Sequence, residues 1–233
     1  MTSLARRDTA VVELMDDPAC DVRLLERTYA QFHVVNRLVS GWRGLWSTRL
    51  RPLLADRKRP TLLDVGFGGG DVATNLAAWA RRDGIPLEVT AIDPDPRAAA
   101  YVARRPRPDG VTFRQASSGD LVAEGRRFDV VVSNHLLHHL HADELQRLLA
   151  DSEQLATGLA LHNDLRRSRL AHAAYGVVTA PVARTSFLRT DGLRSIRRSH
   201  LPAELAGVRP GWRAEPFGRF RLLLHHDAAD GAR

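Results

Sequence analysis

The sequence of 233 residues carries its most chemically distinctive run between an apolar segment and a helical one: Asp64-Val-Gly-Phe-Gly-Gly-Gly-Asp71. Gly66, Gly68 and Gly70 permit positive φ angles and let a ligand approach the backbone closely. Dinucleotide folds use a different spacing, G-x-G-x-x-G, and hold pyrophosphate at the helix start. Asp71 suits the positive end of the helix dipole, but it would repel pyrophosphate. The run therefore predicts a ligand that lacks phosphate.

A second carboxylate follows the next apolar run. Asp93 directly follows Val89-Thr-Ala-Ile92 and lies 25 residues after Gly68. An acidic side chain at this place can accept hydrogen bonds from both hydroxyls of a ribose. Together with the glycine loop, it indicates a nucleoside ligand; a turn aspartate before Pro94 is the alternative.

These residues resemble two motifs of the class I S-adenosylmethionine-dependent methyltransferases. The loop is similar to motif I, D/E-x-G-x-G-x-G, and Ala91–Pro94 resembles motif II. The resemblance implies a Rossmann-like fold, with S-adenosyl-L-methionine as methyl donor and S-adenosyl-L-homocysteine as product. The ammonium and sulfonium of this cofactor favour nearby carboxylates. Position and resemblance assign the cofactor site to Arg37, Asp64, Gly66, Gly68, Gly70, Asp93, Pro94, Ser118, Asp120, Asn134 and His135.

Two of these assignments depend on the resemblance alone. A carboxylate after the third strand contacts the adenine amino group in the family, which makes Asp120 the candidate here. Ser117 and Ser118 lengthen this turn beyond the usual pattern, so Ser118 is expected to share the contact, and a capping role for Asp120 is the alternative. Arg37, on an N-terminal helix, is expected to pair with the methionine carboxylate.

The segment Phe128–Leu140 (FDVVVSNHLLHHL) resembles the part of small-molecule methyltransferases that closes the cofactor site. Histidine suits proton transfer near neutral pH, and helical spacing would place His135, His138 and His139 on one face. His138 and His139 are therefore candidate general bases, and a packed structural pair is the alternative. No metal site is expected, because no matching carboxylate spacing accompanies these histidines.

The acceptor is predicted to be a small molecule. The Asn/Asp-Pro-Pro-Tyr/Phe motif of enzymes that methylate base amines is absent after Ser133, and Cys20 is the only cysteine. The expected reaction is O-methylation of a phenolic or polyketide-type secondary metabolite. The alternatives are C-methylation of a quinone-like ring, RNA or protein methylation, and a non-catalytic cofactor-binding module. The acceptor pocket is assigned to Tyr29, His162, Asp164, Arg167 and His172, although capping explains Asp164 equally well.

The elements that must position these residues alternate between strands and helices. Strands are expected at 61–65, 87–92, 111–115, 128–133 and 158–162, with a closing pair at 212–216 and 219–225. Helices between them predict an α/β fold with a seven-stranded, mostly parallel sheet covered on both faces. Earlier helices make residues 1–58 a helical lid segment, followed by a methyltransferase domain at 59–226 and a disordered tail at 227–233.

The composition limits partners and location. The net charge of +7 comes almost entirely from arginine, and the cluster of Arg194, Arg197 and Arg198 lacks interleaved aromatic residues. Nucleic acid is therefore not the expected partner. A single cysteine, with no signal peptide or membrane-length apolar segment, predicts a cytoplasmic protein. A monomer or a homodimer is expected.

Overall fold

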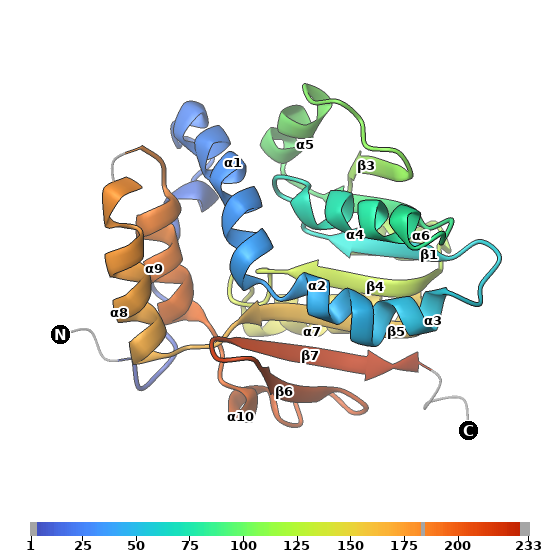
Figure 1. The fold of residues 1–233 in the computed structure, drawn as a ribbon. Coiled ribbons are helices and arrows are strands. Elements are labelled where there is room, and N and C mark those ends of the chain that lie inside the picture. Colours follow the sequence, from blue (N-terminus) through green and yellow to red (C-terminus); the bar gives the residue numbers. More distant parts are fainter. Residues whose placement is uncertain (1–3, 183–184, 229–233) are drawn as a thin grey trace.

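The structure, a computed structural model, describes residues 4–182 and 185–228. Its seven strands are β1 (Thr61–Val65), β2 (Glu88–Asp93), β3 (Val111–Gln115), β4 (Phe128–Asn134), β5 (Ala156–Leu165), β6 (Arg213–Phe217) and β7 (Arg221–Asp227). They form one sheet in the order β3-β2-β1-β4-β5-β7-β6 (Figure 1). The first five strands run parallel, and β7 and β6 are added antiparallel. The mostly parallel α/β sheet predicted from the sequence is confirmed.

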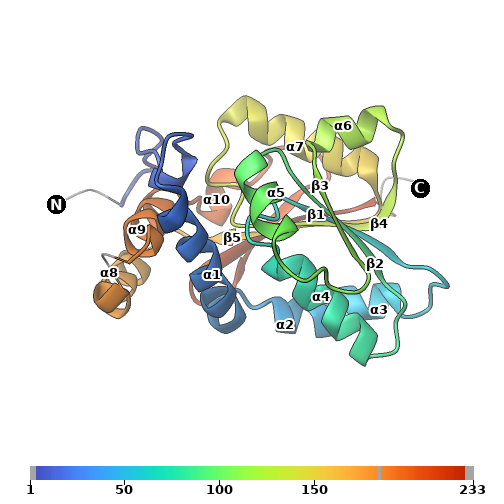
Figure 2. The ribbon, with the colours of Figure 1, turned by 90° about the horizontal axis from the view of Figure 1, so that it is seen from above.

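Helices cover both faces of this sheet. Their bounds are α1 (Val22–Val39), α2 (Trp42–Leu45), α3 (Arg51–Leu54), α4 (Asp71–Arg82), α5 (Pro96–Ala103), α6 (Ser118–Ala123), α7 (Ala142–Leu155), α8 (Arg169–Val178), α9 (Leu188–Arg198) and α10 (Pro202–Leu205). Short 3₁₀ helices lie at Leu14–Asp16 and Ala180–Val182, and a five-residue π-helix lies at Trp46–Leu50. Seen from above, α2, α3 and α4 lie on one side of the sheet, and α6 and α7 on the other (Figure 2). None of the described helices is both long enough and apolar enough to cross a bilayer.

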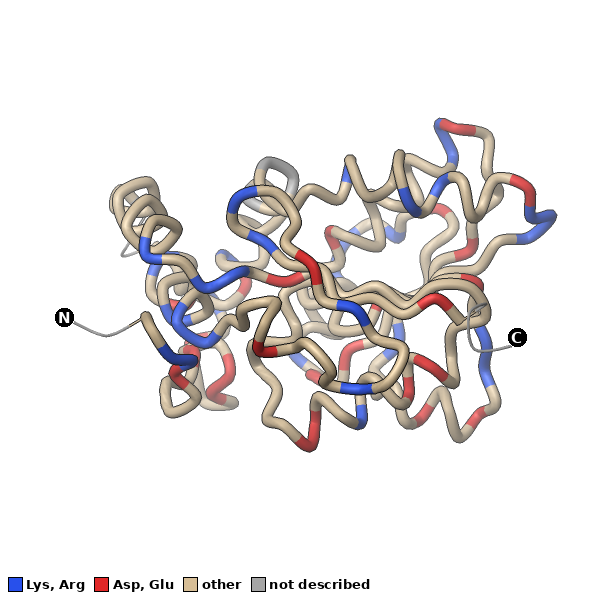
Figure 3. The backbone as a smooth tube through the Cα atoms, turned by 90° about the horizontal axis from the view of Figure 1, so that it is seen from below, with Lys and Arg blue, Asp and Glu red and all other residues tan. Residues whose placement is uncertain are grey.

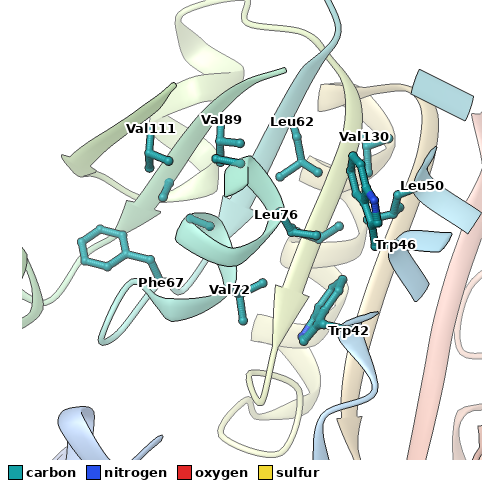
Figure 4. Packing of buried hydrophobic residues seen from close by; sticks show 14 of the residues in the cluster. Trp42, Trp46, Leu50, Leu62, Phe67, Val72, Leu76, Val89, Val111 and Val130 are labelled. Carbon is teal, nitrogen blue, oxygen red and sulfur yellow. The ribbon is translucent and has the colours of Figure 1, made fainter. Parts of the chain in front are cut away.

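The two faces are built by alternation along each strand. Leu62 and Val130 point toward α4, whereas Leu63 and Val131 belong to the core beneath α7. Figure 4 shows Leu62 and Val130 in one row across the strands, with Leu76 of α4 packed against them. Because apolar side chains fill both faces, the strands are rigid, and their carboxyl ends hold the following loops in place.

The first 58 residues contain two different parts. Trp42, Trp46 and Leu50 are fully buried in the core shared with β1 and β4. Residues 42–54 therefore complete one helical layer of the domain, although they precede its first strand. By contrast, α1 stands with α8 and α9 beside the sheet (Figures 1 and 2). Only this earlier part has the position of a lid.

Two local predictions were wrong. The fifth strand continues past His162 to Leu165, so Asn163 and Asp164 are buried strand residues rather than part of a following loop. The cause is tertiary: β5 lies between β4 and β7, and its polar side chains contact Ser133 of β4, Arg221 of β7 and His138 of the turn after β4. The histidine segment is also not helical, because His135 has φ 57° and residues 137–139 form a turn.

Asp227 is the last residue of β7, and residues 229–233 lie outside the described part of the chain.

The basic cluster on α9 binds the N-terminal segment. Arg194 donates to the Val12 carbonyl at 2.6 Å, and Arg197 pairs with Asp8. Arg198 donates to the carbonyls of Val11 and of both His138 and His139. Basic and acidic residues are interspersed in the view from below (Figure 3). This arginine cluster therefore serves intramolecular contacts.

Candidate functional site

A cavity of about 350 Å³ lies at the carboxyl ends of β1, β2 and β4. The strand order reverses between β1 and β4, which is where open α/β sheets bind ligands. Seven of the predicted cofactor residues line it: Asp64, Gly66, Gly68, Asp93, Pro94, Asn134 and His135. Tyr29, Phe32 and Asn36 of α1 complete the lining on the lid side.

The glycine loop has the backbone that its sequence predicts. Gly66, Gly68 and Gly70 have φ angles of 77°, 50° and 76°. The Gly68 N–H donates to Asp93 Oδ2 at 2.9 Å, so this carboxylate fixes the loop as well as facing the cavity. Gly70 does not line the cavity; a Cβ there would come within 2.9 Å of the Phe113 ring. All three glycines thus adopt positive φ, but only Gly66 and Gly68 line the cavity, whereas Gly70 lies against Phe113.

Asp64, Asp71 and Asp93 are three of the six acidic residues in the described lining of the cavity. Burial raises the pKa of Asp64, Asp71 and Asp93, and with the added charge of Asp71 the pKa of Asp64 reaches about 8. Asp64 Oδ2 is buried and has no hydrogen-bond partner within the described residues. A buried carboxylate oxygen without a hydrogen-bond partner favours a ligand that carries positive charge. The ammonium and sulfonium of S-adenosylmethionine meet this requirement.

The residues predicted to contact adenine lie outside this cavity lining. Asp120 Oδ2 accepts hydrogen bonds from the backbone and the hydroxyl of Ser117, both at 2.8 Å, in a capping box that starts α6. Ser118 Oγ donates to Asp151 at 2.6 Å. The structure thus gives both side chains partners at the helix start. The side chain of Arg37 lies outside the described residues.

Sequence reasoning missed the arginine that holds the end of β4. Arg221 of β7 is buried and lies 2.6 Å from His135 Nε2, and it donates to Asn134 Oδ1 at 2.7 Å and Asn163 Oδ1 at 2.7 Å. Burial and the Arg221 charge hold the pKa of His135 well below its ordinary value, so this ring is neutral. The sequence signal for this role was that an arginine, Arg221, begins strand β7 directly before an apolar run.

His138 is held between two carboxylates. Its Nδ1 lies 2.7 Å from Asp164 Oδ1, and its Nε2 lies 3.3 Å from Glu13 Oε1. Burial by itself would lower the pKa of His138, but Asp164 and Glu13 outweigh this effect and raise it to about 10. The raised pKa favours the protonated ring, which argues against His138 as the general base.

His139 is more accessible, and its partners come from the N-terminal segment. The side chain is 23% exposed, and its Nδ1 lies 3.1 Å from Asp16 Oδ2. Glu13 and Asp16 also line the cavity, and neither was among the site residues predicted from the sequence. Glu13 is 2% exposed and accepts a hydrogen bond from Ser195 Oγ at 2.8 Å. The local sequence around Glu13 could not predict its burial, because α9, which is distant in the sequence, covers it.

Of the residues predicted for the acceptor, Tyr29 lines the cavity and the other four do not. His162 lies 2.8 Å from Ser133 Oγ and stacks on Trp212, while Asp164 lies behind His138. Arg167 is buried, donates to the Ser199 carbonyl at 2.6 Å and pairs with Glu204. His172 lies on α8. These four side chains are placed in the supporting structure around the site.

Comparisons with known proteins agree with this geometry. Residues 62–157 match the family described as "Methyltransferase domain". A stretch of 99 residues is 33% identical to the Ubiquinone biosynthesis O-methyltransferase of Cereibacter sphaeroides strain ATCC 17025. That match covers 42% of this chain and 37% of the relative, so the chain matches well under half of the relative's length.

Similarity to solved structures extends over most of the chain. A plantazolicin methyltransferase, in complex with a triazolic desmethylPZN analog and SAH, is 12% identical with a TM-score of 0.61, covering 88% of this chain and 97% of that one. Magnesium protoporphyrin IX methyltransferase from Synechocystis PCC 6803, with bound SAH, is 15% identical with a TM-score of 0.52, covering 89% and 99%. At these identities the likeness shows a shared fold.

The strand order, the left-handed glycines, the carboxylate-lined cavity and the matched domain all lead to one assignment. S-adenosylmethionine is the cofactor that fits the cavity, and SAH complexes recur among the structural neighbours. Residues 62–157 match a methyltransferase domain, and the chain shares its fold with methyltransferases that bind SAH, so it is similar to the class I S-adenosylmethionine-dependent methyltransferases.

Proposed function

We propose that this protein transfers the methyl group of S-adenosylmethionine to a hydroxyl oxygen of a small phenolic or polyketide-type molecule. The observation that carries the proposal is the continuity of one cavity. Its wall runs from Gly68 and Asp93, past Asn134 at the end of β4, to His139 and Glu13. The residues proposed to bind the nucleoside and the carboxylate–imidazole pair Glu13–His139 thus line the same cavity.

The chain's own residues have distinct tasks in this proposal. Asp93 binds the ribose hydroxyls, and Asp64 with the glycine loop receives the methionine end. Asn134 and His135 lie beside the sulfonium, where Arg221 fixes their orientation. The cofactor supplies an activated methyl group, so the protein mainly has to align acceptor oxygen, methyl carbon and sulfur.

A hydroxyl acceptor must also lose its proton. Of the two histidines nominated from the sequence, His138 is buried between Asp164 and Glu13, whereas His139 is 23% exposed and is the one proposed for this step. Its Nε2 faces Glu13 Oε2 at 3.8 Å. A phenol or enol suits this site because its hydroxyl is acidic enough to ionise beside an imidazole.

Other features favour a small acceptor and transfer to oxygen. The cavity is only about 350 Å³, and the arginines of α9 bind the N-terminal segment rather than offering a polyanion track. The relative from Cereibacter sphaeroides is named as an O-methyltransferase of ubiquinone biosynthesis. A quinone-like ring is therefore the second candidate acceptor, with transfer to carbon as the alternative chemistry.

The test has two stages. Calorimetry with S-adenosylhomocysteine should show one binding site, and methyl-labelled cofactor should then label members of a panel of phenols and hydroxyquinones. Products are analysed by mass spectrometry and carbon NMR. A methoxy signal supports the proposal, and a ring-methyl signal supports C-methylation.

Two controls sharpen the outcome. O-methylated members of the panel lack a free hydroxyl and should remain unlabelled. The variant Asp109→Asn removes an exposed carboxylate far from the cavity and should keep full activity. Tight binding of S-adenosylhomocysteine without transfer to any acceptor would overturn the proposal in favour of a non-catalytic module.

A further inference from the structure

Glu13, His138 and His139 form a compact group on the wall of the cavity. One potential ligand atom from each lies within 4.8 Å of the others. The Nε2 atoms of His138 and His139 lie 3.3 Å and 3.8 Å from the two oxygens of Glu13. Ligands of a tetrahedral Zn²⁺ ion at ~2.0–2.1 Å stand about 3.3 Å apart, so little movement is needed to close around an ion.

Each of the three side chains has an outer partner that fixes its direction. The Nδ1 atom of His138 is 2.7 Å from Asp164, and the Nδ1 atom of His139 is 3.1 Å from Asp16. Both Nε2 atoms are thereby turned toward Glu13, which is itself held by Ser195. Metal-binding histidines typically show this carboxylate contact on the ring nitrogen that does not bind the ion.

A second observation indicates a missing ligand. The side chain of His138 is 1% exposed, and its Nε2 has no hydrogen-bond partner within the described residues. Glu13 is near, but the geometry of a hydrogen bond between them is not met. A buried ring nitrogen that faces a carboxylate at 3.3 Å, outside hydrogen-bond geometry, is placed as a metal ligand would be.

We propose that Glu13, His138 and His139 bind one divalent transition-metal ion, with Zn²⁺ as the best match, and that the ion displaces the proton that His138 holds in the ion-free protein. Two imidazoles and one carboxylate are the donor set of catalytic zinc sites, which leave a coordination position for substrate. Mg²⁺ and Ca²⁺ fit poorly, because they prefer oxygen ligands. The open position faces the cofactor cavity, since all three residues line it.

This inference deepens the proposed function, because the ion would bind the hydroxyl of the acceptor. The role of the ion in methyl transfer therefore rests on the proposed function. Coordination lowers the pKa of the hydroxyl, and its proton leaves to solvent. A lone pair of the acceptor oxygen then forms the bond to the methyl carbon, while the carbon–sulfur bond breaks and its electron pair stays on sulfur. In this state His139 is a ligand, and the ion takes over the task of a general base.

Metal binding is tested without any acceptor. The full-length protein is stripped with a chelator and titrated with Zn²⁺ alone by calorimetry and with Co²⁺ alone by visible absorption. We expect one ion per chain and a Co²⁺ spectrum typical of tetrahedral or five-coordinate geometry. Glu13→Gln and His139→Ala should each weaken binding more than about 100-fold, and Asp16→Asn about 10- to 100-fold.

Controls separate a metal site from a structural ion-pair network. His141→Ala removes an exposed histidine outside the group and should keep wild-type affinity for Zn²⁺. Binding of S-adenosylhomocysteine reports whether each variant is folded, and Asp16→Asn, whose side chain is 32% exposed, remains informative if Glu13→Gln does not fold. Zn²⁺ affinity that is absent, or unchanged in both Asp16→Asn and His139→Ala, overturns the proposal.

The two proposals fail separately. Methyl transfer that persists undiminished in stripped protein with no measurable ion affinity removes the metal site and leaves the proposed function intact. Tight Co²⁺ binding that depends on Glu13 and His139, without methyl transfer to any phenol, removes the proposed acceptor class and leaves the metal site.

Discussion

The two halves of the cavity are constructed in different ways. The cofactor half uses residues close in the chain, such as Gly68 and Asp93, which lie 25 positions apart on neighbouring βα units. The half that we propose for the acceptor joins Glu13 to Ser195 across 182 positions and Asp16 to His139 across 123. One half depends on backbone conformation at strand ends, and the other depends on the balance of buried charges.

This difference predicts that substitutions in the two halves will impair different properties of the protein. A left-handed glycine loop fails when a side chain is added, and the damage is local to the ligand. A buried network of Glu13, His138 and Asp164 fails when one charge is removed, and the damage extends to folding. Substitutions in each half should therefore separate cofactor affinity from stability.

Removal of the Asp164 charge should give the largest effect. Asp164→Asn leaves His138 without its main counter-charge, so the free energy of unfolding should fall by about 3–5 kcal/mol in urea denaturation. Affinity of the folded variant for S-adenosylhomocysteine should change less than about threefold. Asp143→Asn, at an exposed pair with Arg147, should alter stability by less than about 0.5 kcal/mol. A loss of cofactor affinity as large as the loss of stability would show that the halves are coupled.

A side chain in the glycine loop should give the opposite pattern. Gly68→Val forces a β-branched residue to φ 50° and places methyl groups in the cavity, so S-adenosylhomocysteine affinity should fall at least ~100-fold, about 2.7 kcal/mol. Gly84→Val is the matched control: Gly84 has φ 74°, and a Cβ there contacts nothing within 4 Å. It should lose similar stability with unchanged affinity in calorimetry. Equal losses of affinity in both variants would contradict a local role.

The pH dependence of stability should report on the cofactor half. Burial raises the pKa of Asp64 to about 8, so the folded state holds a proton that the unfolded state releases near pH 4. The stabilisation from this proton is present at low pH and is lost as the pH rises through 8. Relative to Asp64→Asn, the ligand-free wild type should lose about 2 kcal/mol between pH 6 and 8 in urea unfolding. Parallel pH profiles of the two proteins would show that Asp64 is ionised throughout.

The smallest effect is expected at Asp120. Its carboxylate is engaged by Ser117 at the start of α6, so Asp120→Ala should change S-adenosylhomocysteine affinity less than about threefold and lower the melting temperature slightly. Asp93→Ala provides the contrast in the same calorimetric assay, with a loss of about 10- to 100-fold. A comparable loss at Asp120 would place adenine against α6.

Much of the fold could be predicted because its signals are local. The strand at Thr61–Val65 is bounded as expected, and β4 extends only one residue past its predicted end. Sequence reasoning failed at β5, where Asn163 and Asp164 are strand residues that read as a loop. Their polar groups are satisfied by Arg221 and His138, and hydropathy contains no information about such partners.

The sequence by itself determined the sheet and the cofactor loop. Apolar alternation requires burial of particular faces, and glycine at position 68 is what permits a left-handed turn there. Only the tertiary structure decided that Glu13 meets His138 and that Asp164 raises the pKa of this histidine. Those contacts arise when distant segments pack, and their energies depend on a low-dielectric interior that no single segment possesses.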